Sequence, residues 1–307
     1  MANSSGKPEA EDLTTSLLMT VYHGSKPDWL EVALDSIVNQ TRLADEYVIV
    51  YDGPVSKTIV KLVEQYLGSN DEINLNVIQL PKNEGLCKAL SIGVQACSKN
   101  FIIRMDDDDV SLPDRFDALA KAFAETPNFD VIGTQICEFE ENRTLRLRTV
   151  PINQVDIERK MRFRNAVNHV TVCMRRSAIL AAGNYQNDSA GGFEDFILWH
   201  NLLSKGAKFR NLTDVHVLVR FSRHQISRRR GFRYLQVEFN VFSELYKNHQ
   251  VSLDSFVYFL FVRCPSRLLP NLVLILGYRT LFRRRYALPD SSVIKLLENY
   301  SINIRTS

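Results

Sequence analysis

The chain has 307 residues, of which 45% are hydrophobic and 24% are charged, and its formal net charge is +3. These values are ordinary for a globular protein of one large or two smaller domains, and so small a net charge gives no support to a nucleic-acid partner. The five cysteines are scattered without a CxxC pair, which argues against a disulfide framework and a zinc site and fits a reducing, cytosolic setting.

Residues 1–13 are predicted to form a disordered lead-in. Met1 to Asp12 is polar and acidic and lacks the apolar core of a signal peptide.

Strand and helix patterns alternate after this lead-in. Continuous apolar runs of strand length predict strands, and the segments between them carry apolar residues at helical spacing. The predicted strands are Ser16–Tyr22, Glu46–Tyr51 and Asn74–Leu80. The predicted helices are one capped by Asp28 and running to Val38, Ser56–Leu67 and Leu86–Ala96. This alternation indicates an α/β fold with a mostly parallel central sheet and right-handed crossovers.

Four consecutive carboxylates, Asp106 to Asp109, follow the next predicted strand, Phe101–Met105. A helix is expected to open at Ser111-Leu112-Pro113, so the carboxylates lie at the carboxyl end of a strand, where open α/β sheets bind ligands. Adjacent like charges favour a bound cation, and oxygen ligands suit magnesium, manganese or calcium. The alternative is a solvated acidic turn at a helix start.

The first, second and fourth strands should end on one side of the sheet, because all three are expected to be parallel. Their ends carry Tyr22, Asp52 and Asp106. The arrangement predicts a nucleotide-type cleft, although the chain has neither a GxGxxG loop nor a P-loop.

Five short motifs in this order resemble glycosyltransferase family 2, inverting enzymes with the GT-A fold, a Rossmann-like sheet flanked by helices. The resemblance runs from about Thr15 to about Ser227. The motifs are Thr20-Val21-Tyr22 with the helix end Leu34 to Thr41, Val50-Tyr51-Asp52-Gly53, Asn83-Glu84-Gly85-Leu86-Cys87-Lys88-Ala89, Met105 to Asp109 with the Asp-x-Asp signature, and Gly192-Phe193-Glu194-Asp195.

The sequence departs from the family pattern at two places. Tyr51 replaces the first aspartate of the Asp-Asp-Gly element, so contact with the base would rest on Asp52. The Gln-x-x-Arg-Trp signature of processive synthases is not intact at Gln225 to Arg229, which favours addition of a single sugar.

The resemblance implies a donor site for a UDP-sugar with Mn²⁺ or Mg²⁺. Asp106 would bind the ribose, Asp108 and His224 the metal, and Arg220 could meet the diphosphate. Asp107 has no clear role beyond the donor site, and Asp109 is expected to cap the next helix rather than to bind metal. The residues expected to bind the donor nucleotide are Thr20, Val21, Tyr22, Asp52, Lys82, Asn83, Arg104, Asp106 and Asp107.

The resemblance also assigns the acceptor side. Glu194 and Asp195 precede an apolar helical face, so both are predicted at a helix start, where first-turn acidity is the plain alternative. Asp195 would be the general base of the inverting transfer, and Glu194 a positioning residue or acceptor contact. Gly192 would let the acceptor approach closely, and His169 would lie on the acceptor side.

The last third of the chain is basic and apolar. Phe256–Val262 and Leu268–Leu281 are apolar runs, but neither reaches the ~20 residues of a bilayer span, and Arg228–Arg230 and Arg283–Arg285 flank them. This pattern favours a segment lying on the inner face of the cytoplasmic membrane; helices that cover the sheet or form a homo-oligomer contact are the alternatives.

The predicted organisation is therefore a GT-A catalytic domain over residues 14–230, with a nucleotide-binding half at 14–113 and an acceptor-binding half at 114–230. A helical, membrane-associating extension covers residues 231–307. The expected activity is transfer of one hexose, galactose or glucose, from a UDP-sugar to a saccharide on an undecaprenyl-diphosphate-linked O-antigen or polysaccharide intermediate. The rivals are a noncatalytic sugar-nucleotide or membrane-binding protein and a nucleotidyltransferase.

Overall fold

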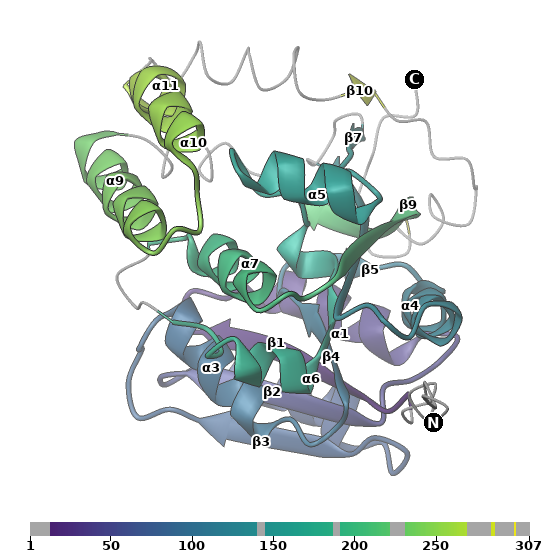
Figure 1. The fold of residues 1–307 in the computed structure, drawn as a ribbon. Coiled ribbons are helices and arrows are strands. Elements are labelled where there is room, and N and C mark those ends of the chain that lie inside the picture. The colour runs from purple at the N-terminus through teal and green to yellow at the C-terminus, as the bar shows by residue number, and fades with distance from the viewer. Residues whose placement is uncertain are drawn as a thin grey trace, which may run out of the picture.

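The protein is described by a computed structural model over residues 13–139, 145–186, 191–221 and 231–268, together with 284–285 and 298. A central sheet is covered by helices on both faces, and a group of helices from the end of the described chain lies beside it (Figure 1). Among the described helices, none combines the length and hydrophobicity needed to cross a membrane.

The sheet has the order β10-β7-β6-β8-β4-β1-β2-β3, and β9 joins it through β6 and β5. The strands are β1 (Thr15–Tyr22), β2 (Glu46–Asp52), β3 (Leu75–Gln79), β4 (Phe101–Met105), β5 (Val110–Ser111), β6 (Val131–Phe139), β7 (Arg146–Arg148), β8 (Cys173–Arg175), β9 (Phe209–Arg220) and β10 (Arg284–Arg285).

The first half of the sheet is parallel, as the alternation of strands and helices predicts. β1 pairs in parallel with β2 and with β4, and β2 pairs in parallel with β3. The register sets Tyr22 opposite Asp52, and Met19 opposite Met105. The ends of β1, β2 and β4 therefore lie at one edge of the sheet, where the cleft was expected.

The second half of the sheet is mixed. β8 pairs antiparallel with β4 and β6, whereas β9 runs parallel to β6 and antiparallel to β5. Because β5 directly follows the four aspartates, its pairing with β9 fixes their loop against a distant part of the chain. The structure thus confirms an α/β fold and shows that antiparallel strands complete the sheet.

Helices bury both faces of the sheet. In β1, Leu18 belongs to one buried apolar cluster, whereas Leu17 and Met19 belong to the other, as the alternation of side chains along a strand requires. The helices of the first half and of the sheet's second half are α1 (Pro27–Val38), α2 (Lys57–Val63), the π-helical turn η1 (Glu64–Gly68), α3 (Leu86–Ala96), α4 (Arg115–Glu125), α5 (Gln154–Met161), the 3₁₀ turn η2 (His169–Thr171), α6 (Arg176–Ala181) and α7 (Glu194–Ser204).

Two predicted helix starts are wrong by a few residues. Helix α1 begins at Pro27 after the capping position Lys26, so Asp28 lies in the first turn rather than at the cap. Proline suits the first helical position, because its missing N–H has no intrahelical partner there in any case. Helix α4 begins at Arg115, because Val110–Ser111 continues as a strand paired with β9.

Gln40, at the end of the Leu34 to Thr41 motif, joins α1 to the segment after the aspartates. Its buried side-chain amide donates to the carbonyls of Ser36 and Leu112, at 2.8 Å each, and its oxygen accepts the backbone N–H of Phe116. Gln40 therefore fixes the start of α4 and, with it, the segment that follows the aspartate loop. Its motif was identified in the sequence only through the family resemblance.

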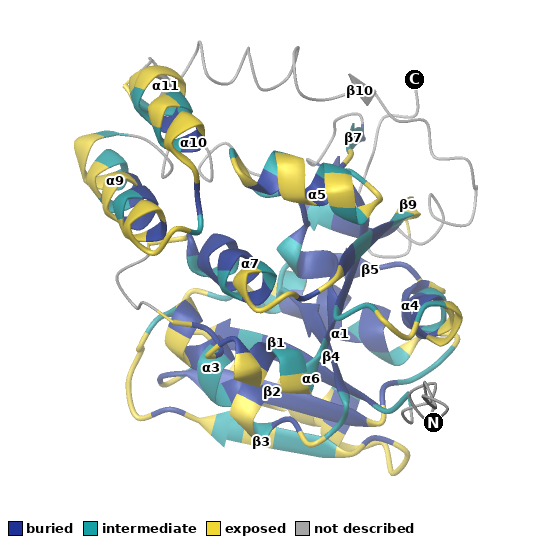
Figure 2. Cartoon of the chain, in the orientation of Figure 1, coloured by how far each residue is buried: buried dark blue, intermediate teal, exposed yellow. Residues whose placement is uncertain are grey.

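The chain ends, as described, in a helical extension. Its elements are α9 (Gly231–Lys247), α10 (Leu253–Tyr258), the π-helical turn η3 (Phe259–Arg263) and α11 (Cys264–Arg267). Figure 2 shows α9 with a buried face and an exposed face. Phe242 and Phe259 are fully buried and stack on each other at 4.5 Å within the cluster that contains Phe196 of α7.

A buried charge cluster ties this extension together. Glu238 of α9 is fully buried, and its carboxylate is paired with Arg263 and Arg267. Arg263 also donates to the carbonyl of Phe163 at 2.6 Å. The described part of the extension is therefore packed onto α7 and the segment that follows α5, and the apolar run Phe256–Val262 contributes Phe259 to that core. The rest of the extension, apart from residues 284–285 and 298, lies outside the described residues.

Candidate active site

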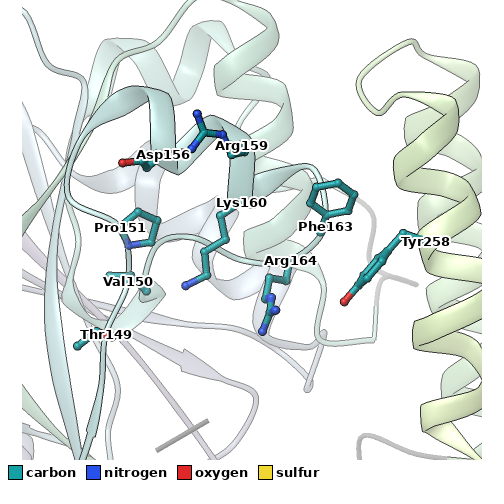
Figure 3. Close-up of a pocket in the computed structure, with 9 residues that line it drawn as sticks. All are labelled: Thr149, Val150, Pro151, Asp156, Arg159, Lys160, Phe163, Arg164 and Tyr258. Atoms are coloured by element: carbon teal, nitrogen blue, oxygen red, sulfur yellow. Dashed lines mark hydrogen bonds and ion pairs between the residues drawn. The ribbon is translucent and has the colours of Figure 1, made fainter. Parts of the chain in front are cut away.

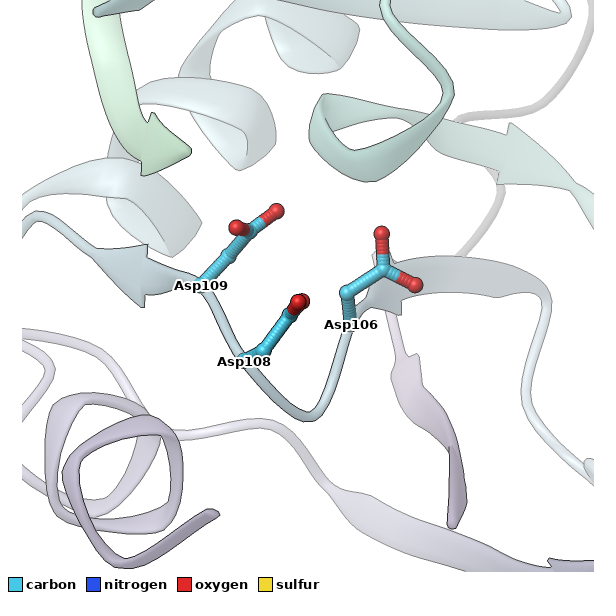
Figure 4. Close-up of side chains that lie close together, drawn as sticks. All are labelled: Asp106, Asp108 and Asp109. Carbon is cyan, nitrogen blue, oxygen red and sulfur yellow. The ribbon is translucent and has the colours of Figure 1, made fainter. Parts of the chain in front are cut away.

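Three of the four consecutive aspartates converge. Asp106, Asp108 and Asp109 lie on the loop between β4 and β5, and Figure 4 shows their carboxylates around a common space. One oxygen of each lies within 4.8 Å of the others. Burial and the neighbouring carboxylates raise the pKa of Asp108 and Asp109, and burial raises the pKa of Asp107 to about 6. Holding these groups ionised together therefore costs free energy that a bound cation would offset.

The loop is held by charged and backbone partners. Arg104, buried at the end of β4, makes a two-pronged ion pair with Asp106. Asp109 does not cap α4, contrary to the prediction. It is buried and accepts the backbone N–H of Arg220 at 2.8 Å, because the β5–β9 pairing brings the end of β9 to this loop. The Arg220 guanidinium lies over the rings of Trp29 and Phe139 and reaches the Asp108 carbonyl.

The donor set fits a hard divalent cation. Carboxylate oxygens at this spacing, without sulfur, suit Mg²⁺, Mn²⁺ or Ca²⁺. The residues that could hold the ion are Asp106, Asp108 and Asp109, of which only Asp108 was expected to be a ligand; His224, the other expected ligand, lies outside the described residues.

Asp52 lies at the end of β2, as predicted, and binds the backbone of the next motif. Its two carboxylate oxygens accept the N–H groups of Glu84, at 2.7 Å, and Gly85, at 3.0 Å. Gly53 has φ +83°, and a Cβ there would approach the Asn83 nitrogen to 2.5 Å, so only glycine fits this close passage of two loops. Asp52 therefore fixes the loop that contains Asn83, another residue expected to bind the donor.

The other expected donor-binding residues differ in exposure. Tyr22, at the end of β1, is 42% exposed, and its N–H donates to the Ser25 hydroxyl, which also interacts with Asp107. Lys82 is exposed and forms a 3.5 Å ion pair with Glu84. Thr20 is half-buried and Val21 is fully buried, so Val21 is a core residue that can offer a ligand only its backbone.

Tyr51, which replaces the usual aspartate, belongs to the core. It is 5% exposed in the apolar cluster on the α1 and α2 face, where burial raises its pKa to about 12. In this chain the aromatic ring fills space between sheet and helices, and Asp52 is left as the carboxylate of the motif.

Glu194 and Asp195 occupy the first turn of α7, as predicted. Asp195 accepts the side-chain amide of Asn165 and the backbone N–H of Phe196, both at 2.7 Å. Burial and the charge of Asp195 raise the pKa of Glu194 to about 7. Gly192, which precedes them, has φ +96°, and a Cβ added there would meet no atom of the described residues within 4 Å.

His169 joins this acceptor side through Tyr185. The His169 Nε2 lies 2.6 Å from the Tyr185 hydroxyl, and the imidazole packs edge-on against Trp199. Burial and the positive charge of Arg104 hold the pKa of His169 well below its usual range, so the ring is neutral.

Arg104 lies within electrostatic range of both carboxylate groups. It is paired with Asp106, and its positive charge also acts on Tyr185 and Glu194, whose pKa values are raised chiefly by burial. The expected donor and acceptor residues therefore lie within electrostatic range of one another.

Three residues that position side chains or backbone of the site were not predicted from the sequence. Asn165 positions Asp195, Tyr185 holds His169, and the fully buried Arg115 donates to the carbonyls of Arg104 and Val170 at 2.6 and 2.8 Å. Each acts through a partner far away in the sequence, so no local spacing indicates its role.

Comparisons with known proteins identify the family of the chain. The family model described as glycosyl transferase family 2 matches residues 16–182, more than half of the chain. The amylovoran biosynthesis glycosyltransferase AmsE of Erwinia amylovora is 33% identical over 83% of this chain and 94% of its own length. An Escherichia coli UDP-Gal:alpha-D-GlcNAc-diphosphoundecaprenol beta-1,3-galactosyltransferase is 28% identical over 88% of this chain and 96% of its own length.

Solved structures share the fold at low sequence identity. S. aureus TarS 1–349, in complex with UDP-GlcNAc, has a TM-score of 0.61 and 16% identity, covering 94% of this chain and 79% of that one. The mannosyltransferase PcManGT from Pyrobaculum calidifontis, in complex with GDP-Man and Mn²⁺, has a TM-score of 0.58 and 14% identity, covering 94% and 80%. The architecture is the expected GT-A type, and the chain belongs to glycosyltransferase family 2.

Proposed function

We propose that this glycosyltransferase moves a single hexose, galactose or glucose, from a UDP-sugar to a hydroxyl of an undecaprenyl-diphosphate-linked saccharide, with inversion and with Mn²⁺ or Mg²⁺. The observation that carries the proposal is the convergence of Asp106, Asp108 and Asp109, whose carboxylate oxygens lie within 4.8 Å of one another on the loop after β4. The E. coli relative, whose name gives a UDP-galactose donor and a lipid-diphosphate acceptor, supports this choice of substrates.

On the donor side, the chain binds and orients the nucleotide. Tyr22 offers an exposed ring for stacking on a base, and the loop fixed by Asp52 lies beside it. Asp106 is oriented by Arg104 for a ribose hydroxyl, and Asp108 with its neighbours would hold the metal. When bound, the metal supplies positive charge that stabilises the departing diphosphate.

On the acceptor side, the chain activates the attacking hydroxyl. Asp195, held by Asn165 and the Phe196 N–H, takes the hydroxyl proton as the acceptor oxygen forms its bond to the anomeric carbon. The bond from that carbon to the diphosphate oxygen breaks on the opposite face, and UDP leaves with the electron pair. The product carries an inverted anomeric centre, and Asp195 holds one proton that solvent then removes.

The exposed face of the C-terminal helices supports contact with the inner face of the cytoplasmic membrane. Phe232 is 79% exposed, Phe261 75% and Leu253 61%. Large exposed apolar side chains on these helices, in a part of the sequence that also carries the basic runs Arg228–Arg230 and Arg283–Arg285, suit the boundary of an anionic leaflet. Such contact would bring the site to a lipid-linked acceptor.

A donor panel tests the proposal. UDP-galactose, UDP-glucose, UDP-GlcNAc and GDP-mannose are incubated with Mn²⁺ or EDTA and with a synthetic lipid-diphosphate saccharide, and both transfer and hydrolysis are measured. Metal-dependent transfer from one UDP-hexose is expected. Nucleotide binding without transfer or hydrolysis of any donor would instead favour a noncatalytic sugar-nucleotide-binding protein.

A further inference from the structure

A cavity lies away from the aspartate loop. It has a volume of about 630 Å³, within the range of small-molecule sites, and opens between α5, the segment before it and α10 (Figure 3). None of the described residues of the proposed donor, metal or catalytic groups lines it. The lining residues are Thr149, Val150, Pro151, Asp156, Arg159, Lys160, Phe163, Arg164 and Tyr258.

The lining is cationic. Arg159, Lys160 and Arg164 contribute three positive charges, against the single carboxylate of Asp156, which is paired with Arg159 at 2.8 Å. Figure 3 shows the Lys160 and Arg164 side chains extending to the same side of the cavity. Two further cations on one wall suit a ligand with more than one negative charge, such as a diphosphate.

The opposite side of the cavity is aromatic and leads to an apolar surface. Phe163 and Tyr258 meet edge to face with ring centroids 5.1 Å apart, which joins the end of the α5 segment to α10. Val257 and Phe261, on either side of Tyr258 in the chain, are 42% and 75% exposed. A ligand held here could therefore place an anionic group on the basic wall and a hydrocarbon chain along α10.

The cavity is next to the acceptor side of the active site. Arg164, which lines it, directly precedes Asn165, whose amide holds the Asp195 carboxylate. In a lipid-diphosphate-linked monosaccharide, one sugar ring separates the accepting hydroxyl from the diphosphate. The base, Asp195, and a site for the diphosphate must then lie close together. The order of Arg164 and Asn165 in the chain is consistent with this, because Arg164 lines the cavity and Asn165 holds Asp195.

We propose that this cavity binds the diphosphate of the lipid-linked acceptor, with Lys160 and Arg164 on the phosphates and the aromatic wall beside the start of the lipid. The inference rests on the proposed function and adds the site that selects the acceptor. The inference predicts that the enzyme recognises the diphosphate of the acceptor as well as its sugar.

The binding test uses dodecyl diphosphate as the probe and needs neither donor nor turnover. We expect the Lys160→Gln/Arg164→Gln variant to bind it about tenfold or more weakly, because two charge-assisted contacts are lost. Lys61→Gln/Lys205→Gln removes two exposed charges elsewhere and is the matched control. Lys160→Arg/Arg164→Lys keeps the charge and should retain most of the binding. Melting temperatures confirm that all variants are folded.

A second arm separates the acceptor from the bilayer. Sedimentation with vesicles of phosphatidylcholine and phosphatidylglycerol should be the same for the Gln pair and the control. Unchanged dodecyl diphosphate binding in the Gln pair overturns the proposal. So does an equal loss toward vesicles and probe, which would mark a general anionic-lipid surface.

A third arm distinguishes this inference from the proposed function. With a UDP-sugar, the Gln pair should raise KM for a lipid-diphosphate acceptor about tenfold and leave KM for a phosphate-free glycoside acceptor unchanged. Equal effects on both acceptors contradict the cavity's role while the transferase assignment stands. Absence of transfer in the unmodified enzyme contradicts the function, and the binding arm still decides whether the cavity holds a diphosphate.

Discussion

The two carboxylate groups of the site are held in different ways. On the donor side, Asp52 and Asp109 accept backbone N–H groups, from Glu84 and Gly85 and from Arg220. On the acceptor side, the Asp195 carboxylate is oriented by a side chain, Asn165, as well as by the backbone of its own helix. Asp52 and Asp109 are thus built into the loops of the sheet, whereas Asp195 is also held by a side chain, as Asp106 is by Arg104.

This difference indicates that the carboxylates of the site have different roles. A carboxylate whose oxygens accept buried backbone donors contributes to loop geometry and stability. A carboxylate in the first turn of a helix, held by one side-chain donor and one backbone donor, suits a role in proton transfer. We therefore expect donor-side substitutions to affect stability and nucleotide binding together, and acceptor-side substitutions to affect turnover alone.

The largest expected effect is that of Asp195→Asn. Loss of the base should lower kcat about a thousandfold, within the usual contribution of general bases, and leave UDP affinity and the melting temperature nearly unchanged. Single-turnover transfer measures the rate, and calorimetric titration with UDP measures the affinity. Equal losses of turnover and of UDP binding would place Asp195 on the donor side and break the distinction.

Asp52→Ala should act in the opposite way. Removing the acceptor of two backbone N–H groups is expected to lower the free energy of unfolding by about 2–3 kcal/mol and to weaken UDP binding. Denaturant titration gives the first quantity. Asp71→Ala, at an exposed position, is the control. Unchanged stability would mean that the loop does not depend on this carboxylate.

Asn165→Ala tests whether the acceptor side depends on a positioning side chain. We expect kcat to fall about tenfold, the value of one lost hydrogen bond to a charged group, without a change in donor KM. Asn165→Asp, which replaces the donor by a second carboxylate, should be worse than alanine at high pH. If alanine leaves kcat unchanged, Asp195 is oriented by its own helix alone.

Glu194→Gln should give the smallest effect, one that depends on pH. The pKa of Glu194 is raised to about 7 by burial and by Asp195, so the carboxyl is charged above that pH and neutral below it. The ratio of wild-type to variant kcat/KM should therefore be greatest about one pH unit above 7 and approach one below it, because neutral glutamate and glutamine carry the same charge. A ratio independent of pH would contradict an ionised role for Glu194.

The donor side could be predicted largely from sequence because its signals are local. The strand Phe101–Met105 and the helix Leu86–Ala96 have the predicted bounds, and Asp52 and Asp106 follow their strands as expected. The misplaced cap at Asp109 has a nonlocal cause: the partner is the N–H of Arg220, brought there by the β5–β9 pairing.

The acceptor side could be predicted only in part. The helix start at Glu194 and Asp195 follows from the apolar periodicity of α7, but the contacts of Asp195 with Asn165 and of His169 with Tyr185 depend on how distant segments pack. Tyr51 illustrates the reverse case, because a departure from the motif proved to be a core residue whose role is packing.

The central claim is that the aspartate loop holds a divalent cation against the nucleotide. Calorimetric titration of UDP into the full-length protein, with Mn²⁺ and with EDTA, tests it most directly, with Asp108→Ala as the second protein. We predict that Mn²⁺ tightens UDP binding by at least about tenfold in the unmodified protein and has no effect in Asp108→Ala. Equal UDP affinity with Mn²⁺ and with EDTA in the unmodified protein would contradict the account.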